Sequence, residues 1–173
     1  MKQLRRAFFV FCSVFCFLQI LASSSWASGQ PPKTRNFGLG IEVGSPTALT
    51  GKYWYDPGHA VDMGLGYWFG NYIEIFGDYL WHWPRAFSGT RDPGPEFVPY
   101  IGVGGEFHVA NGAPPVTDNN HPTVGIYARI PFGMEWLPPR APVGIFLEIV
   151  PAIQIIPGIY VAFGADIGAR FYF

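Results

Sequence analysis

Charged residues are scarce in this chain. They make up 13% of its 173 residues, whereas soluble domains average about 25%. Cysteine is nearly absent: Cys12 and Cys16 both lie in the first apolar segment, so no disulfide is available to the rest of the chain. Beyond that segment no run approaches the ~20 unbroken apolar residues of a membrane-spanning helix, which excludes a helical membrane protein.

The amino-terminal segment has the three-part build of a secretory signal peptide. A basic head precedes an apolar run over residues 7–22, and the small residues Ser25 and Ala27 fit a cleavage site before Ser28. The run is too short for a typical membrane anchor. We therefore expect three parts, which are a signal peptide at 1–27, a polar lead at 28–36 and one barrel domain at 37–173.

The charge balance after cleavage argues against nucleic acid as a partner. Removing Lys2, Arg5 and Arg6 from the 11 basic residues leaves 8 against 12 acids, so the net charge is about −4. Binding to phosphate groups requires a basic face instead.

The last fourteen residues, 160–173, show the alternation of a membrane-spanning β-strand. One face is wholly apolar, and the other is rich in glycine and carries Asp166 and Arg170. Successive strand side chains point to opposite faces. An apolar face toward lipid and a polar face toward the lumen are typical of transmembrane barrels.

Eight alternating runs, separated by turn residues, follow the polar lead. They cover residues 37–44, 48–55, 60–69, 72–82, 97–108, 124–136, 143–155 and 160–173. The sequence therefore predicts an all-β fold, an eight-stranded antiparallel up-and-down transmembrane β-barrel. Pro99, Pro131 and Pro151 fall inside runs and delete ladder donors, so we expect bulges or interface positions there.

The charged residues within the runs all lie opposite the apolar stripe, as expected if that stripe faces lipid. Glycines share the charged face and leave room for long side chains in a narrow lumen. The predicted lumen charge network comprises Glu42, Lys52, Asp62, Glu74, Asp78, Glu106, Arg129, Glu135, Glu148, Asp166 and Arg170. Its eight acids outnumber its three bases, so we expect a hydrated or partly protonated network. Aromatic residues near the run ends predict girdles at the membrane interfaces.

Two segments resemble known families. The ending, residues 164–173, resembles the terminal signal of bacterial outer-membrane proteins, in which a final Phe after alternating apolar residues is read by the barrel-assembly machinery. Residues 46–54, Pro-Thr-Ala-Leu-Thr-Gly-Lys-Tyr-Trp, resemble a stretch in a family of small outer-membrane barrels of unknown function, with Ala48 and Thr50 as departures. The resemblance implies an eight-stranded OmpA/OmpX-like barrel in the bacterial outer membrane, with Phe171 and Phe173 as the assembly signal.

The leading functional interpretation is a monomeric, non-enzymatic protein with a structural or surface-binding role. Its expected partners are outer-membrane lipid and lipopolysaccharide, the assembly machinery during biogenesis, and an unidentified surface ligand at residues 109–123, a polar segment between two strands. We predict no catalytic, cofactor or metal site. The serines stand apart from the histidines along the chain, and His82 and His108 are expected at opposite ends of the barrel. The alternatives are an enzyme that modifies lipid A, as an acyl hydrolase or transferase, and a narrow ion or water channel.

Overall fold

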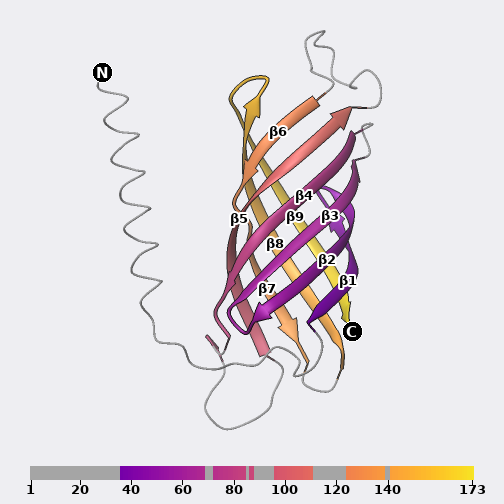
Figure 1. The fold of residues 1–173 in the computed structure, drawn as a ribbon, viewed down its shortest axis with the longest axis vertical. Helices are drawn as coiled ribbons and strands as arrows, with labels where there is room; N and C mark the ends of the chain where they lie inside the picture. The colour runs from indigo at the N-terminus through magenta and orange to yellow at the C-terminus, as the bar shows by residue number, and fades with distance from the viewer. Residues whose placement is uncertain (1–35, 69–71, 85, 88–95, 111–123, 139–140) are drawn as a thin grey trace, which may run out of the picture.

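The computed structural model describes residues 36–68, 72–84, 86–87, 96–110, 124–138 and 141–173. The predicted signal peptide and nearly all of the polar lead lie outside these ranges. Within them, no helix is long and apolar enough to cross a membrane. The described residues form one ring of antiparallel strands (Figure 1). The predicted all-β antiparallel barrel is thus confirmed as a fold.

The strands follow one another around the ring in chain order. They are β1 (Phe37–Gly44), β2 (Thr47–Asp56), β3 (His59–Trp68), β4 (Tyr72–His82), β5 (Glu96–Ala110), β6 (Val124–Arg129), β7 (Phe132–Leu137), β8 (Val143–Ile156) and β9 (Tyr160–Tyr172). β6 and β7 lie one after the other between β5 and β8, and β1 pairs with β9 to close the ring.

The predicted sixth run, 124–136, is two strands in the structure. The register with β8 is the same on both sides of the break, since Arg129 pairs with Ala152 and Phe132 with Ile149. Two prolines explain the break. Gly102 N donates to Pro131 O at 2.8 Å, and Ile130 N donates to Pro151 O at 3.0 Å. In each pair the reverse bond is missing because proline has no N–H. β6 and β7 thus occupy one strand position.

The bulges expected at the prolines are not where the register shifts. β5 pairs with β7 in unbroken register through Pro99, which faces Met134. Pro99 O accepts from Trp83 N at 3.0 Å, just after β4 ends, so the missing donor falls at the end of a ladder. The register shifts lie instead at Trp54/Asp56 and at Ile126/Tyr127.

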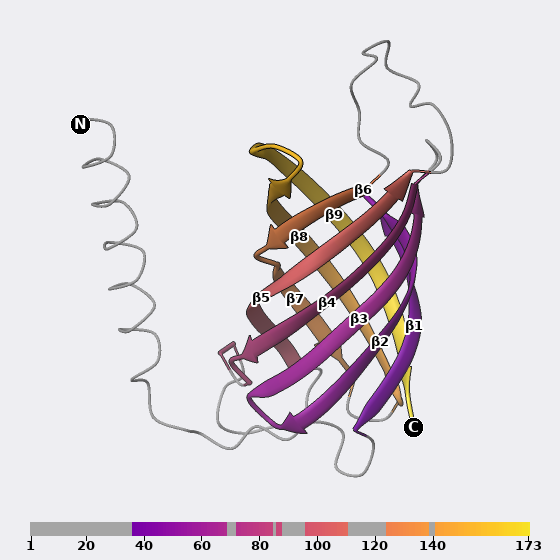
Figure 2. The ribbon, with the colours of Figure 1, turned by 45° about the horizontal axis from the view of Figure 1, so that its top comes forward.

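The strands are strongly staggered, and Figure 2 shows them slanting around the ring. A ladder started at Gly38 passes through each strand in turn and arrives at Ala162 of β9. Gly38 itself pairs with Tyr172, ten residues further along β9. Stagger, tilt and strand number together fix the width of a barrel, and eight strands leave an interior that side chains can fill.

The two ends of the barrel differ. At the end called here the terminal end, Phe173 N donates to Phe37 O at 2.8 Å. At the opposite end, called here the loop end, β5 stops at Ala110 and β6 starts at Val124. β1 stops early, where Gly44 pairs with Asp166, so residues 160–164 of β9 pair with β8 alone among the described strands.

The two faces of the ring have opposite character. Leu147 is 58% exposed and its neighbour Glu148 only 5%, and the same alternation gives an exposed Met63 beside a buried Asp62. The outer face is therefore apolar, whereas the charged side chains point inward together with buried rings such as Trp54 and Phe146.

Glycines on the inner face make room for aromatic rings. Gly64 pairs with Phe76, and a Cβ at Gly64 would overlap the Phe76 ring. Gly168 pairs with Phe146 and stands in the same relation to it. Each ring thus lies across the glycine of the neighbouring strand, as in other sheets where an aromatic covers a glycine.

We expect Gly64→Ala to lower the free energy of unfolding by about 1–3 kcal/mol, because the added methyl group overpacks the site against Phe76. Gly77→Ala is the matched control on β4. Gly77 is exposed, and a Cβ there would meet only Asp62 O at 3.8 Å. Denaturant unfolding in detergent micelles measures both variants. Equal stability of the two would contradict the packing assigned to Gly64.

Candidate functional site

The interior of the barrel holds the charged residues predicted to form a network. The structure places all eleven on the inward face. Ten are buried, and the Glu106 side chain is 10% exposed. Nine of them fall into groups around the three bases Lys52, Arg170 and Arg129, and each group draws on strands far apart in the sequence.

Lys52 is the base nearest the terminal end. Its Nζ donates to Glu135 Oε2 at 2.5 Å and lies 2.8 Å from His82 Nε2, which accepts because an ammonium group only donates. Tyr172 Oη donates to Glu135 Oε1 at 2.5 Å. The Lys52 ammonium also lies 4.4 Å from the centre of the Trp54 ring. A fully buried charge is tolerable only with such partners.

Arg170 lies in the middle of the lumen. Its Nη2 donates to Thr50 Oγ1 at 2.8 Å and to Asp62 Oδ2 at 3.0 Å. Its guanidinium carbon lies 3.8 Å from the centre of the Phe146 ring, which is one of the rings that cover a glycine. The ring and the carboxylate together fix the orientation of the guanidinium.

Arg129 lies nearer the loop end and forms ion pairs with four carboxylates. Its closest partners are Asp78 and Glu148, each at 3.2 Å, and its more distant partners are Glu106 at 3.5 Å and Glu74 at 3.8 Å. The guanidinium carbon is 4.1 Å from the Phe76 ring centre. One arginine thus faces four carboxyl groups, so acidic residues outnumber arginines in this part of the lumen.

Glu42 and Asp166 are buried on the β1 and β9 side of the lumen. Among the described residues, neither forms an ion pair. Their position agrees with the expected surplus of acid in the interior.

The histidines do not gather. His82 contacts Lys52 toward the terminal end, whereas His108 of β5 pairs with Glu74 of β4 toward the loop end. His59 lies at the β2–β3 turn, where its Nδ1 is 2.9 Å from Asp56 Oδ1. His121 lies outside the described residues, as do Ser28 and Ser88.

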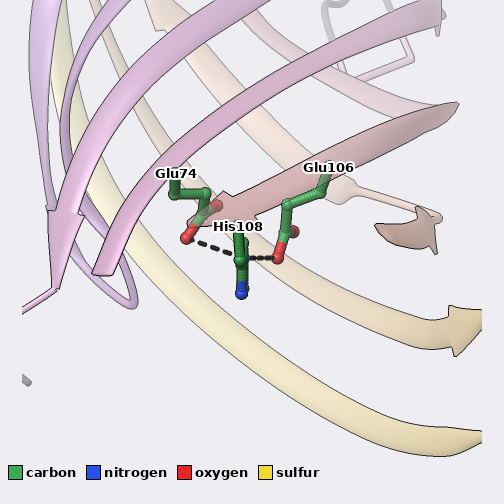
Figure 3. Close-up of side chains that lie close together, drawn as sticks. All are labelled: Glu74, Glu106 and His108. Carbon is green, nitrogen blue, oxygen red and sulfur yellow. Dashed lines mark ion pairs between the residues drawn. The ribbon is translucent and has the colours of Figure 1, made fainter. Parts of the chain in front are cut away.

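Three residues that were not predicted as a site, Glu74, Glu106 and His108, lie together in the structure. The positions of the histidines relative to one another and to the serines do not indicate this group. Figure 3 shows the carboxylates of Glu74 and Glu106 on either side of the His108 ring. The positions of these residues in the sequence could have indicated the group. Glu106 and His108 are two apart on one strand and share a face, and a hairpin of β4 with β5 sets Glu74 directly opposite His108.

Phe171 and Phe173, predicted as the assembly signal, lie on the outer face at the terminal end. Both are exposed, and their ring centres are 5.1 Å apart in an edge-to-face arrangement. Their recognition by assembly machinery stays a prediction.

Comparison with known proteins supports the fold. The crystal structure of the N-terminal β-barrel domain of Pseudomonas aeruginosa OprF is similar, with a TM-score of 0.58 and 12% sequence identity over 80% of this chain and 98% of that chain. At that identity the likeness concerns the fold alone, and the narrower OmpA/OmpX-like assignment stays a prediction. No curated protein sequence matches the chain. A sequence model of the family described as "Protein of unknown function (DUF3996)" matches residues 30–173.

The Lys52–Glu135 pair allows a double-mutant test. Lys52→Met and Glu135→Gln each leave one buried charge without its partner, and we expect each to cost about 3–5 kcal/mol of unfolding free energy. The double variant carries neither charge, and the amide oxygen introduced by Glu135→Gln would still accept from Tyr172, so we expect it to be more stable than either single variant. Denaturant unfolding in detergent measures the cycle. Additive losses would show that the pair is not coupled.

Proposed function

The chain belongs to the DUF3996 family of proteins of unknown function, and we propose that it is an integral β-barrel of the bacterial outer membrane with a non-enzymatic, structural or surface-binding role. The observation that carries this proposal is the apolar outer face of the ring. Large apolar side chains are exposed on every strand position, for example Ile41, Leu49, Met63, Ile75, Val103, Phe132, Leu147 and Ile167.

Such a face fits lipid better than water. The largest apolar patch on a soluble monomer is typically a few hundred Å², whereas here the apolar face continues around the whole ring. A closed ladder also satisfies the backbone groups that hydrocarbon cannot. The match to a barrel domain of OprF supports the same reading.

An aromatic belt near the terminal end supports a membrane interface there. The ring centres of Tyr53 and Tyr55 are 5.4 Å apart, those of Tyr55 and Tyr79 are 6.4 Å apart, and those of Tyr79 and Trp81 are 4.9 Å apart. Rings with an apolar body and a polar edge concentrate at the level of the lipid headgroups.

The packed interior favours a structural role over a channel. Trp54, Tyr172, Arg129 and Arg170 are among the largest fully buried side chains. They belong to all three charge groups, so the lumen is filled along its length. An eight-stranded barrel of this kind is a filled cylinder and not a pore.

The surface-binding part of the proposal rests on the direction of the chain. With both described ends of the barrel in the periplasm, the segment between Ala110 and Val124 faces outward, where long loops of outer-membrane barrels normally lie. Val109 and Ala110 of the predicted loop belong to β5, and residues 111–123 lie outside the described residues. Lipid and lipopolysaccharide are the partners of the outer face, and the barrel acts as a monomer.

Leu147→Arg tests the lipid-facing surface. An arginine there is expected to cost about 2–4 kcal/mol at mid-membrane and to block insertion. Glu148→Gln is the matched control, because the adjacent side chain faces the lumen and should insert as the unaltered chain does. A heat-modifiability gel of outer-membrane fractions reports folded protein. Equal insertion of both variants would overturn the proposed membrane-facing surface.

Deletion of Phe173 tests the outer-membrane destination. If assembly machinery reads this residue, the deletion should lower folded protein in cells several-fold and leave refolding in detergent nearly unchanged. The deletion removes one bond to the neighbouring strand, Phe173 N to Phe37 O, and leaves the rest of the ladder between β9 and its neighbours. A folding defect in both settings would point to a structural role only. Normal assembly in cells would count against the signal.

A further inference from the structure

Glu74, Glu106 and His108 form a compact group on the inner face near the loop end, called here the rim site. His108 Nε2 lies 3.3 Å from Glu74 Oε2 and also contacts Glu106 Oε1 (Figure 3). One ligand atom from each residue lies within 4.8 Å of the other two. Two paired strands supply all three side chains, so the backbone ladder fixes their spacing.

We propose that the rim site binds one divalent transition-metal ion, of which Zn²⁺ fits best. An imidazole nitrogen with carboxylate oxygens is a donor set that zinc accepts, whereas magnesium and calcium prefer oxygen alone. Ligands about 2.0–2.1 Å from zinc in tetrahedral geometry lie about 3.3 Å apart, which matches the His108–Glu74 distance of 3.3 Å. The tighter contact of His108 with Glu106 opens to admit the ion.

The charge around Arg129 supports this site. Arg129 lies closest to Asp78 and Glu148, both at 3.2 Å, and its two longer contacts, 3.5 and 3.8 Å, are those to Glu106 and Glu74. The two carboxylates offered to the ion are therefore the two that Arg129 holds least closely. A divalent ion neutralises them and leaves Arg129 with its two near partners.

Glu74 provides a second, independent observation that points to a bound ion. Its side chain is 5% exposed, and its Oε1 is buried with no hydrogen-bond partner among the described residues. Arg129 Nη1, at 3.8 Å, is too far away to donate to it. A buried carboxylate oxygen in this state is costly unless something occupies its free lone pairs. A metal ion that shifts or bridges this carboxylate is such a partner.

The rim site can be reached from solvent, and its histidine ring is held in place by a neighbouring ring. The His108 side chain is 22% exposed, so an ion reaches it from the loop end without crossing the packed lumen. The Tyr127 ring lies 4.5 Å from the His108 ring, which limits its rotation. Three protein ligands leave one tetrahedral position for water or for a donor from outside the barrel.

The test is a titration of the purified, untagged chain, folded in detergent, with Zn²⁺ by calorimetry. We expect one saturable site, no competition from a tenfold excess of Mg²⁺, and a rise in the unfolding midpoint with Zn²⁺, because an ion that binds only the folded state stabilises it. His108→Gln and Glu106→Gln should each weaken binding at least tenfold. His59→Gln, a histidine next to an acid at the other end of the barrel, should bind as the unaltered chain does.

Three results would overturn the proposal. They are the absence of saturable binding and of any midpoint shift in the unaltered chain, equal affinity of His108→Gln and the unaltered chain, and loss of binding in His59→Gln. A heat-modifiability gel checks the folding of each variant. Because the midpoint shift is measured on the unaltered chain, it decides the question even if both rim variants fail to fold. The outcome is independent of the membrane proposal, since it concerns the folded barrel in detergent.

Discussion

The burial of three cations in a narrow lumen is the constraint on which the rest of this structure depends. Each cation lies over an aromatic ring, and each ring covers a glycine directly opposite on the neighbouring strand. The three stacks, from cation to glycine, are Lys52–Tyr100–Gly133, Arg129–Phe76–Gly64 and Arg170–Phe146–Gly168. A side chain in place of the glycine would displace the ring, and the ring positions the cation among its carboxylates. Three glycines of the inner face are required by this arrangement.

The same arrangement couples the inside of the barrel to its outside. Side chains alternate with a period of two, so a slip of one residue in any strand would turn its charges outward and its apolar residues inward. The ion pairs therefore act together with the apolar belt in favour of one register. The Lys52–Glu135 contact crosses the lumen between residues 83 positions apart. The Arg170–Thr50 contact joins residues 120 positions apart on either side of β1, where the ring closes. Both contacts therefore form only when the ring is closed.

Much of the fold could be predicted from the sequence, because alternation is a local property. The predicted runs agree with the strands to within two residues at each end, apart from the sixth, and alternation alone assigned the eleven charges to one face. The break at Pro131 could not be placed exactly from the sequence. It depends also on Pro151 of β8, which lies beside Ile130 and has no N–H to donate back to it. The sequence also could not predict which charged residues pair with one another in the lumen, because the pairing depends on the ten-residue stagger of the closed ring. The rim site is the exception: its three residues come from one hairpin, and the register of that hairpin would have revealed it.

The early end of β1 has a consequence for the proposed membrane location of the barrel. Residues 160–164 of β9 have β8 on one side and no strand of the described chain on the other, so the N–H and C=O groups along that edge need water, yet Val161 and Phe163 are exposed apolar side chains. Hydrocarbon cannot satisfy the first need and bulk water does not suit the second. Only the headgroup layer meets both. Under the outer-membrane location proposed above, this edge would therefore set the depth of the barrel in the bilayer. The wall of the barrel is taller on the side of β8 and β9 than on the side of β1.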